Sequence, residues 1–380
     1  MWFLQTDTLL LLTALCALFG LASCIAKKQY PKLLRLLPLF EIGFLAYVSP
    51  GFAVFYVGYI LLTWSFAVAL RRVRRARGLV FAVLCCGCML PLFYSRLAEA
   101  PVIALVGMAY NMLKAIDVLY FEYFTGEKAQ FEVYCNYMLF LPVLTAGPVF
   151  RYRDFLRTWL RPAVLTLDRF TDGVKRIIRG LFSKVVLSAI GVSLLGTLTA
   201  DTIVWYESLL IPPVSLAILY FDMSGYASVA IGLGSIMGLQ VPENFKKPFQ
   251  CASFTQFWRN WHVTVSDWIR EHVFILFRKT KLSKWQGAAV SVMVMVVMGL
   301  WHDFTVLYLV DGVILGAFLA IEAIFGLGTV NKRKTPKWNY RMRCFAVFYL
   351  FALNSMIFTL TTEQIGQVFR GFVTMTGGLG

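Results

Sequence analysis

Residues 286–302 read QGAAVSVMVMVVMGLWH, an uncharged apolar run that ends in His302. At about 1.5 Å per helical residue, the run is roughly 24 Å long and approaches the thickness of the hydrocarbon core of a bilayer. His302 is therefore predicted to lie well inside the membrane. A polar side chain at that depth is costly and is usually retained for function.

Apolar runs of similar length recur along the chain. They cover residues 3–25, 36–49, 52–70, 79–95, 101–123, 133–149, 180–199, 209–232, 286–302, 304–326 and 343–361. Basic clusters lie between many of these runs, and loops rich in Lys and Arg are typical of the cytoplasmic side of a membrane. Pairing the runs between the clusters predicts about ten transmembrane helices, with both termini outside the cytoplasm.

Two segments do not fit simple spans. Residues 133–149 break the pairing, and a re-entrant segment that ends at the Ala-Gly-Pro of residues 146–148 restores it. Residues 238–285 mix tryptophan with charged side chains and histidine, which indicates an amphipathic or re-entrant element on the cytoplasmic side. The predicted fold class is an all-α polytopic membrane protein with additional re-entrant and amphipathic helices.

Composition supports membrane residence. Hydrophobic residues make up 59% of the 380 and charged residues 15%, and the mean hydropathy is +0.70. A soluble domain carries about 25% charge. The net charge of +16 comes from basic clusters between apolar runs, so contact with anionic lipid headgroups explains it without nucleic acid.

The cysteines and the N-terminus carry no separate signal. None of the eight cysteines has metal-site spacing together with histidine, so neither a metal site nor a redox role is predicted. Residues 3–25 lack a positively charged start and are predicted to remain as a transmembrane helix rather than to be cleaved as a signal peptide.

The chain has three histidines, so the candidates for a general base are few. Histidine is the side chain best suited to proton transfer near neutral pH. For His302 the simpler alternative is a hydrogen bond that joins two helices. Asp303 follows directly but does not share a helical face with His302, so it is either a participant or a solvated carboxylate at the mouth of the site. His272 has the pattern of an ordinary interfacial residue.

Two further polar positions stand out. His262 lies in the stretch FWRNWHVTVSDWIR of residues 257–270, where it shares a helical face with Ser266. Interfacial anchoring explains the tryptophans of this stretch but not its histidine, serine and aspartate. Asp222 lies in the apolar stretch YFDMSGY of residues 220–226, as either a functional acid or the partner of a nearby arginine.

Ordered motifs resemble the signature of the membrane-bound O-acyltransferase family. They are AGPVFRYRDF at 146–155, YFDMSGYA at 220–227, PENFKKPF at 242–249, FWRNWH and WIR within 257–270, and GLWH at 299–302. The resemblance covers roughly residues 100–325. It implies one transmembrane domain over residues 1–380 with a central pore, divided into N-terminal helices (1–100), a catalytic core (101–326) and a C-terminal helix (327–380).

The resemblance also implies roles for single residues. His302 matches the catalytic membrane-embedded histidine of the family, and His262 matches its second histidine, on the cytoplasmic side. The side chains expected to line the channel or contact substrate are Asp303, Trp301, Asp222, Ser224, Asn244, Trp258, Trp261 and Arg270.

Bacterial members of the family pass an acyl group from a cytoplasmic thioester to an extracytoplasmic hydroxyl. The implied donor is a phosphopantetheinyl carrier protein or acetyl-CoA, and no bound cofactor is expected. The implied partners are a cytoplasmic acyl-carrier protein, an extracytoplasmic accessory transferase, a teichoic acid or polysaccharide acceptor and membrane lipids. The implied location is the bacterial plasma (inner) membrane.

Two bacterial subgroups share these motifs. The Lys114-Ala115-Ile116 stretch resembles the D-alanyl transfer (DltB-type) subgroup that modifies teichoic acid, whereas AGPVFRYRDF resembles the alginate O-acetylation (AlgI-type) subgroup. The compact length favours D-alanyl transfer, with O-acetylation of an exopolysaccharide or cell-wall glycan as the alternative. The chain departs from the family at Asp303, where glycine is usual, and at Leu315, where a further histidine is usual.

Functions of two other classes are also compatible with polar residues in membrane spans. A transporter or flippase typically has repeated halves with paired broken helices, and the sequence shows no such repeat. A scaffold for a partner acyltransferase would tolerate point substitutions at His302 and His262. The sequence therefore predicts an O-acyltransferase in which His302 is the general base and His262 acts on the donor side.

Overall fold

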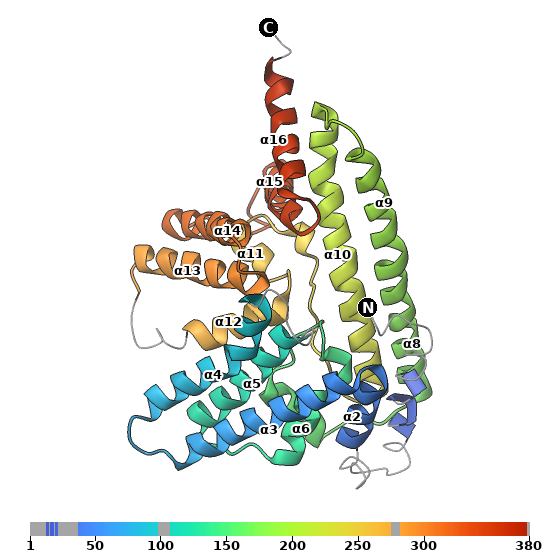
Figure 1. Cartoon of the computed structure of the whole chain (residues 1–380). Helices are drawn as coiled ribbons and strands as arrows, with labels where there is room; N and C mark the ends of the chain where they lie inside the picture. The colour runs from blue at the N-terminus through green and yellow to red at the C-terminus, as the bar shows by residue number, and fades with distance from the viewer. Residues whose placement is uncertain are drawn as a thin grey trace. The chain divides into compact units, whose positions relative to one another are not determined.

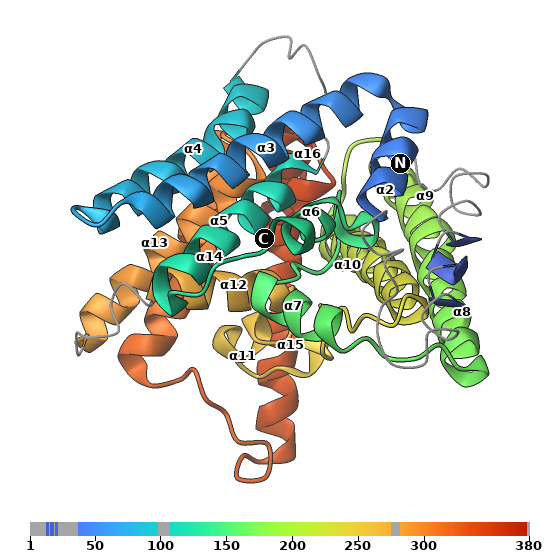
Figure 2. The same ribbon diagram turned by 90° about the horizontal axis from the view of Figure 1, so that it is seen from below.

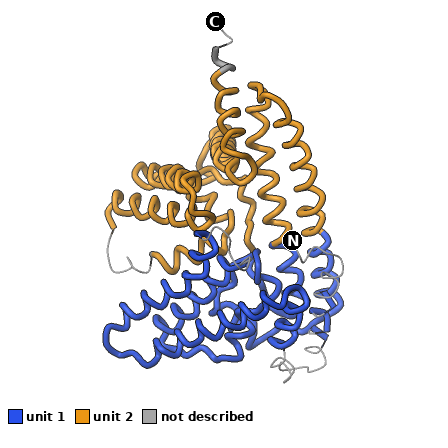
Figure 3. The backbone as a smooth tube through the Cα atoms, in the orientation of Figure 1, with its two compact units in different colours: residues 1–178, 227–242 blue, residues 179–226, 243–380 orange. Residues whose placement is uncertain are grey.

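The computed structural model describes residues 13–14, 16–18, 20–21, 37–97, 107–274 and 282–377. Within these residues the chain is helical and contains no strand. The backbone forms two compact units, one of residues 1–178 and 227–242 and the other of residues 179–226 and 243–380 (Figure 3). We call them unit 1 and unit 2.

The helices of the first half of the chain are labelled in Figure 1. They are α2 (Leu37–Val48), α3 (Pro50–Arg72), α4 (Arg77–Leu97), α5 (Met108–Thr125), α6 (Phe131–Leu139), η3 (Leu141–Val143), α7 (Tyr152–Leu160), α8 (Leu167–Leu181), the π-helix η4 (Phe182–Leu187) and α9 (Ser188–Leu198).

The second half begins with the longest of these helices. Its elements are α10 (Trp205–Ile236), η5 (Pro248–Gln250), α11 (Phe254–Trp258), α12 (Val263–Phe274), α13 (Lys284–His302), α14 (Val306–Phe325), α15 (Lys337–Ser355), η7 (Met356–Phe358) and α16 (Thr362–Gly377).

Seven of the described helices are long and apolar enough to cross a membrane. They are Pro50–Arg72, Arg77–Leu97, Leu167–Leu198, Trp205–Ile236, Lys284–His302, Val306–Phe325 and Lys337–Phe358, and each corresponds to a predicted span. The predicted span over residues 36–49 is a shorter apolar helix, Leu37–Val48. The predicted span over residues 3–25 lies almost wholly outside the described residues. The total of about ten therefore stays a prediction.

In the two segments predicted to be irregular, the described residues (133–149, 238–274 and 282–283) contain no helix of spanning length. In the first, α6 ends at Leu139 and is followed by one short 3-10 turn at residues 141–143. In the Trp-rich segment, η5, α11 and α12 are 3, 5 and 12 residues long. Both observations agree with the predicted departure from simple spans.

In unit 1, α3 and α4 lie side by side in both views (Figures 1 and 2), and polar side chains tie the helices together. Arg71, in the last turn of α3, donates to the buried Glu122 carboxylate of α5, with Nε 2.9 Å from Oε2. Lys114 of α5 is buried, and its Nζ donates to the carbonyl oxygens of Tyr137 (3.1 Å) and Met138 (3.3 Å). The last carbonyls of a helix have no partner within it, so Lys114 caps α6.

In unit 2, α13 and α14 form a hairpin that glycine permits. A Cβ atom at Gly312 would lie 2.6 Å from the Met295 carbonyl oxygen, and one at Gly299 would lie 2.2 Å from the Tyr308 carbonyl oxygen. The backbones of the two helices therefore touch, as small residues allow in membrane helix pairs. The N-terminus of α13 is capped by Ser283, which accepts from Gln286 N while the Gln286 side chain accepts from Ser283 N.

A hydrophobic cluster closes one end of unit 2. It joins the α9–α10 turn to the end of α15 and to α16 through Leu195, Ile203, Ile211, Ile218, Met356, Leu360 and Val368. Because Met356 belongs to this cluster, η7 is held in place next to the end of α13.

Candidate active site

His302 is the last residue of α13, and three aromatic rings surround its imidazole. The ring centroids lie 4.9 Å away for Trp301, 5.2 Å for Phe358 and 6.2 Å for Tyr308. The Phe358 ring meets the imidazole edge to face, with an interplanar angle of 79°. His302 is half-buried, so its imidazole is both held in position and accessible to a ligand.

His262 is buried in the connection between α11 and α12. Its Nδ1 lies 3.2 Å from Asn244 Oδ1, an oxygen that also accepts from Thr264 N (3.3 Å) and Thr264 Oγ1 (2.8 Å). Because an amide oxygen only accepts, Nδ1 of His262 carries the hydrogen and Nε2 is the unprotonated ring nitrogen. Asn244 is therefore the residue that fixes the tautomer of His262.

Burial and, to a smaller extent, the positive charge of His302 together lower the pKa of His262 to about 3. His262 is therefore neutral at physiological pH. This coupling also shows that the two histidines are close enough for their charges to interact. The structure thus brings together the two predicted catalytic residues.

The backbone at His262 adopts a left-handed conformation, with φ of +44°. Side chains other than glycine rarely take this conformation, so surrounding contacts must hold it. The Asn244 carbonyl accepts from Val263 N at 2.9 Å, and Lys246 N donates to the Asn260 carbonyl at 2.9 Å. These two bonds fix the His262 backbone against the extended segment that carries Asn244.

Aromatic packing holds the same connection in place. The buried Trp261 ring stacks on Phe257 (5.4 Å, 17°) and meets Phe245 and Phe351 edge to face at 5.0 and 5.1 Å. Tyr220 of α10 reaches Trp261 at 6.1 Å, and its hydroxyl is hydrogen-bonded to Ser224. Trp261 and Tyr220 therefore pack around the connection that carries His262, and the predicted contact of Trp261 and Ser224 with substrate stays a prediction.

A cavity of about 430 Å³ lies within unit 2, between α11, α12, α13 and α14. Arg259 and Arg270, both with exposed side chains, contribute to its lining. Its remaining wall combines one carboxylate, Glu322, with hydroxyl and apolar side chains: Thr255, Trp258, Ser266, Ile269, Ser291, Val294, Met295, Met298, Leu319, Ala323 and Thr329, with Gly326 and Gly328. The cavity thus follows α13 as far as Met298, which lies one turn before His302 on the same helical face.

One buried donor in this wall has no acceptor among the residues that the structure describes. Nε1 of Trp258 is inaccessible to solvent and makes no hydrogen bond to any of them. A buried N–H group without a partner is costly unless a ligand or water supplies one. The cavity therefore presents cationic groups, and one of its lining residues, Trp258, holds a buried N–H group that is available to a ligand after a small movement of the ring.

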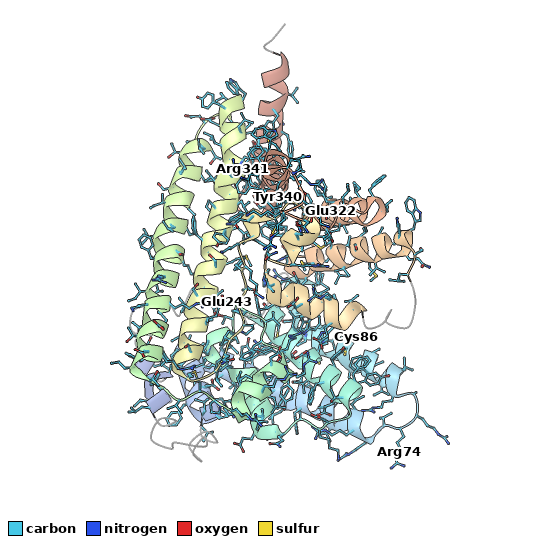
Figure 4. All side chains as sticks on the ribbon, turned by 180° about the vertical axis from the view of Figure 1, so that it is seen from behind. Arg74, Cys86, Glu243, Glu322, Tyr340 and Arg341 are labelled. Atoms are coloured by element: carbon cyan, nitrogen blue, oxygen red, sulfur yellow. The ribbon has the colours of Figure 1, made fainter. Side chains whose placement is uncertain are left out.

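Glu322, labelled in Figure 4, anchors the floor of this cavity and was not predicted. Its carboxylate accepts from Phe254 N (2.6 Å), Thr255 N (2.8 Å) and Thr255 Oγ1 (2.7 Å), at the N-terminus of α11. A carboxylate at a helix N-terminus satisfies amides that have no partner within the helix. The sequence feature that could have identified Glu322 is its position as an acidic residue near the end of an apolar run.

Asp222 lies on α10 and forms an ion pair with Lys184 of η4, whose side chain is 4% exposed. The sequence analysis considered a nearby arginine as a partner of Asp222, but the residue that pairs with it in the structure is Lys184. A Cβ at Gly225 would lie 2.6 Å from the Gly180 carbonyl oxygen of α8 and 2.8 Å from Lys184 N of the π-helix, so α10 touches both one turn from the ion pair. Asp222 therefore joins two membrane-length helices, and its predicted contact with substrate stays a prediction.

The remaining predicted residues flank the site. Asp303 is extended (φ −161°, ψ 152°), and its Oδ1 accepts from Phe304 N at 2.9 Å. This contact shapes the turn between α13 and α14. Arg270 forms an ion pair with Asp267 one turn earlier on α12 and lines the cavity.

In a comparison with known protein families, the model of the membrane-bound O-acyltransferase family matches residues 108–361 of this chain. That range contains His262, His302, the residues that line the cavity and every other predicted site residue. The chain belongs to the membrane-bound O-acyltransferase family. It is thus a multi-pass membrane protein, in agreement with its seven candidate spans.

Named relatives fall in both predicted subgroups. The chain is 32% identical over 249 residues to a probable alginate O-acetylase AlgI of Pseudomonas fluorescens, covering 62% of this chain and 48% of that protein. It is 28% identical over 282 residues to a teichoic acid D-alanyltransferase of Streptococcus thermophilus (67% and 68%). It is 26% identical over 312 residues to that of Bacillus subtilis (74% and 78%). The chain spans about half the length of the alginate O-acetylases it matches.

Two rings that frame His302 in this member of the O-acyltransferase family were not predicted. Tyr308 and Phe358 belong to α14 and η7, and each follows an ordinary apolar pattern in the sequence. Their centroids lie 5.5 Å apart. Only the folding of α14 and α15 next to the end of α13 identifies them, so no sequence signal was available.

Proposed function

We propose that this protein is an O-acyltransferase that moves an acyl group from a thioester donor to a hydroxyl of a cell-envelope polymer. The cavity that follows α13 to Met298, one turn before His302, is the observation that carries this proposal. A donor in that cavity would deliver its reactive carbon to the imidazole. Membership of the O-acyltransferase family supports the same reaction.

The chemistry of the cavity fits a phosphopantetheine thioester. Arg259 and Arg270 supply cations for a phosphate, the Trp258 N–H supplies a donor for an amide carbonyl, and Met295 and Met298 supply an apolar surface for the acyl end. From Ser291 to His302, α13 rises about 16 Å, which requires a long and narrow ligand. A phosphopantetheinyl carrier protein and acetyl-CoA both carry this arm.

In the proposed reaction His302 is the general base. Its unprotonated ring nitrogen takes the proton of the acceptor hydroxyl while the oxygen attacks the thioester carbonyl. The carbon–sulfur bond then breaks, and the protonated imidazole returns the proton to the leaving thiolate. The products are an ester and a free thiol, and His302 regains its initial state.

The proposed role of His262 differs from that of His302. Its low pKa keeps it from accepting a proton at neutral pH, and its Nδ1–H is committed to Asn244. Its Nε2, the unprotonated ring nitrogen, is an acceptor and orients a donor group in the site. We therefore assign His262 to positioning on the donor side.

Two donor–acceptor pairs fit this reaction. D-alanyl transfer to teichoic acid matches the named function of the Streptococcus and Bacillus relatives, of whose length the chain covers 68% and 78%. Acetyl transfer to an exopolysaccharide matches the alginate O-acetylase, which has the higher identity at 32%. In either version we place the protein in the bacterial plasma membrane, with a cytoplasmic acyl carrier and an extracytoplasmic accessory transferase as partners.

The test compares envelope acyl esters in cells that produce wild-type protein, His302→Ala or His272→Asn. His272 serves as the matched control because its Nδ1 bonds the Trp268 carbonyl oxygen at 2.8 Å, outside the cavity lining. Acyl groups released by alkali are identified by mass spectrometry. We expect His302→Ala to lose the ester and His272→Asn to retain it, with released D-alanine or acetate identifying the donor.

Normal ester content in the His302→Ala cells would contradict the catalytic assignment and favour a scaffold role. If deletion of the gene changes no envelope ester, acyl transfer itself is wrong and a transporter becomes the better explanation.

A further inference from the structure

Asp311 is a buried acid that the proposed reaction does not use. It lies in α14, a helix of membrane-spanning length, and is 5% exposed. An ionisable side chain within a span is costly, and such residues are usually retained for function. A leucine at this position would avoid that cost, so the carboxyl must contribute something that an apolar side chain does not.

The partner of Asp311 is Asn354, in the last turn of α15. The Asn354 amide Nδ2 donates to Asp311 Oδ1. The amide is neutral, so the contact does not offset a charge in the way an ion pair would. Two apolar side chains would hold two membrane helices together at a lower desolvation cost. What the hydrogen bond adds is a fixed register between α14 and α15.

The pair lies one turn from the rings that frame His302. Tyr308 precedes Asp311 by three residues on α14, and Phe358 follows Asn354 by four residues. Residues at these spacings share a helical face. The two rings are 5.5 Å apart, and both contact the His302 imidazole. A change in the register of α14 and α15 would therefore move these rings apart.

We propose that Asp311 and Asn354 are positioning residues whose hydrogen bond holds Tyr308 and Phe358 around the His302 imidazole. The proposal rests on the proposed function, in which His302 is the general base. Without the bond the imidazole samples more orientations, and the fraction in reactive geometry falls. Neither residue lines the cavity, so donor binding is unaffected.

The experiment uses full-length protein reconstituted in lipid vesicles. Initial rates of thioester consumption are measured with acetyl-CoA and with a D-alanyl phosphopantetheinyl carrier protein, and kcat and KM are taken for each donor that wild-type protein turns over. The variants are Asp311→Leu, Asn354→Leu, their double variant and Asp311→Asn. Val313→Leu is the matched control, because this α14 side chain is 45% exposed.

We expect each leucine variant to lower kcat at least about tenfold with KM unchanged within about twofold. Asp311→Asn keeps an acceptor for Asn354 and stays within about threefold of wild type. The double leucine variant is expected to melt like wild type and still to show the low kcat. Val313→Leu is expected to match wild type.

Wild-type kcat in the double leucine variant would overturn the proposal, because the pair would then only hold the helices together. A raised KM with unchanged kcat would overturn it as well. The parallel His302→Ala variant separates the two claims. If it is inactive while Asp311→Leu is fully active, only this inference fails; if it is active, the proposed function fails first.

Discussion

His262 and His302 carry the same side chain in two different settings, and the settings assign them different tasks. His262 is buried, bonded to Asn244 and neutral because its pKa is about 3. His302 is half-buried at the end of α13, with rings on its sides and the cavity one turn away. A residue that cannot hold a proton at neutral pH is a poor general base, and this supports the proposal that His302 has that role.

The low pKa of His262 predicts an acid-sensitive fold. In the unfolded chain its imidazole takes up a proton near pH 6.5, whereas in the folded protein it does so only near pH 3. The unfolded state thus binds more protons in this range, and the free energy of unfolding falls by up to about 1.4 kcal/mol per pH unit as the pH drops below 6.5. Thermal melts of detergent-solubilised protein at pH 7.5 and about 5.5 measure this loss.

The control is His262→Asn, which removes this titration. Its melting temperature is expected to be lower than that of wild type at pH 7.5 and to change less on acidification. An equal decrease of the melting temperature on acidification in wild type and His262→Asn would contradict the assignment of a buried neutral histidine.

The unpartnered Trp258 N–H predicts a binding defect. Trp258→Phe keeps most of the aromatic surface and removes only the donor, so KM for the thioester is expected to rise about fivefold with kcat nearly unchanged, the equivalent of one hydrogen bond of about 1 kcal/mol. Trp285→Phe is the matched control, because that side chain is 72% exposed. Equal KM values in the two variants would mean that Trp258 does not contact the donor.

At the scale of single residues, the sequence identified the polar members of the site better than the apolar ones. His302, His262 and Asp222 stood out because polar side chains are rare in apolar surroundings. Tyr308 and Phe358 could not be recognised, because aromatic residues are common in membrane helices and only tertiary packing selects these two. The Lys184 partner of Asp222 was missed for a related reason, since it depends on the pairing of α10 with η4.

At the scale of helices, the contact between α13 and α14 sets the position of His302. The Cβ of Gly312→Ala would lie 2.6 Å from the Met295 carbonyl oxygen, so this variant is expected to lose about 1–3 kcal/mol of stability and to accumulate at a lower level. Gly287→Ala, on α13, is the matched control because nothing lies within 4 Å of its Cβ. Thermal melts and membrane abundance report the difference, and equal stability of the two variants would argue against the close helix contact.

Periodicity and hydropathy located most elements but not their boundaries. The predicted run over residues 180–199 is the second part of a longer helical segment, Leu167–Leu198, whose first part is amphipathic and basic and so escaped a hydropathy criterion. The π-helix inside it has no signature in the sequence. Residues 133–149 were separated from the spans because they break the pairing between basic clusters, and the structure has only part of the nine-residue α6 and a short 3-10 turn there.

At the scale of the whole molecule, family membership and the seven candidate spans agree with the predicted polytopic protein. The acyl group and the acceptor could not be predicted, because they depend on contacts that the family motifs do not encode. Asp303 and Leu315 are the two positions at which the sequence departs from the family pattern, and Asp303 directly follows the proposed catalytic histidine, His302. The relatives do not identify the acyl group either, since they include both O-acetylases and D-alanyltransferases.

The most direct test of the central claim is transfer across a membrane. Full-length protein is reconstituted in sealed vesicles, and the phosphopantetheine thioester is supplied on the side of the basic loops while a hydroxyl acceptor is supplied on the other. We predict that wild type and His272→Asn form ester on the acceptor side and release thiol on the donor side in equal amounts, and that His302→Ala forms neither. Ester formation by His302→Ala at the wild-type rate would contradict the account.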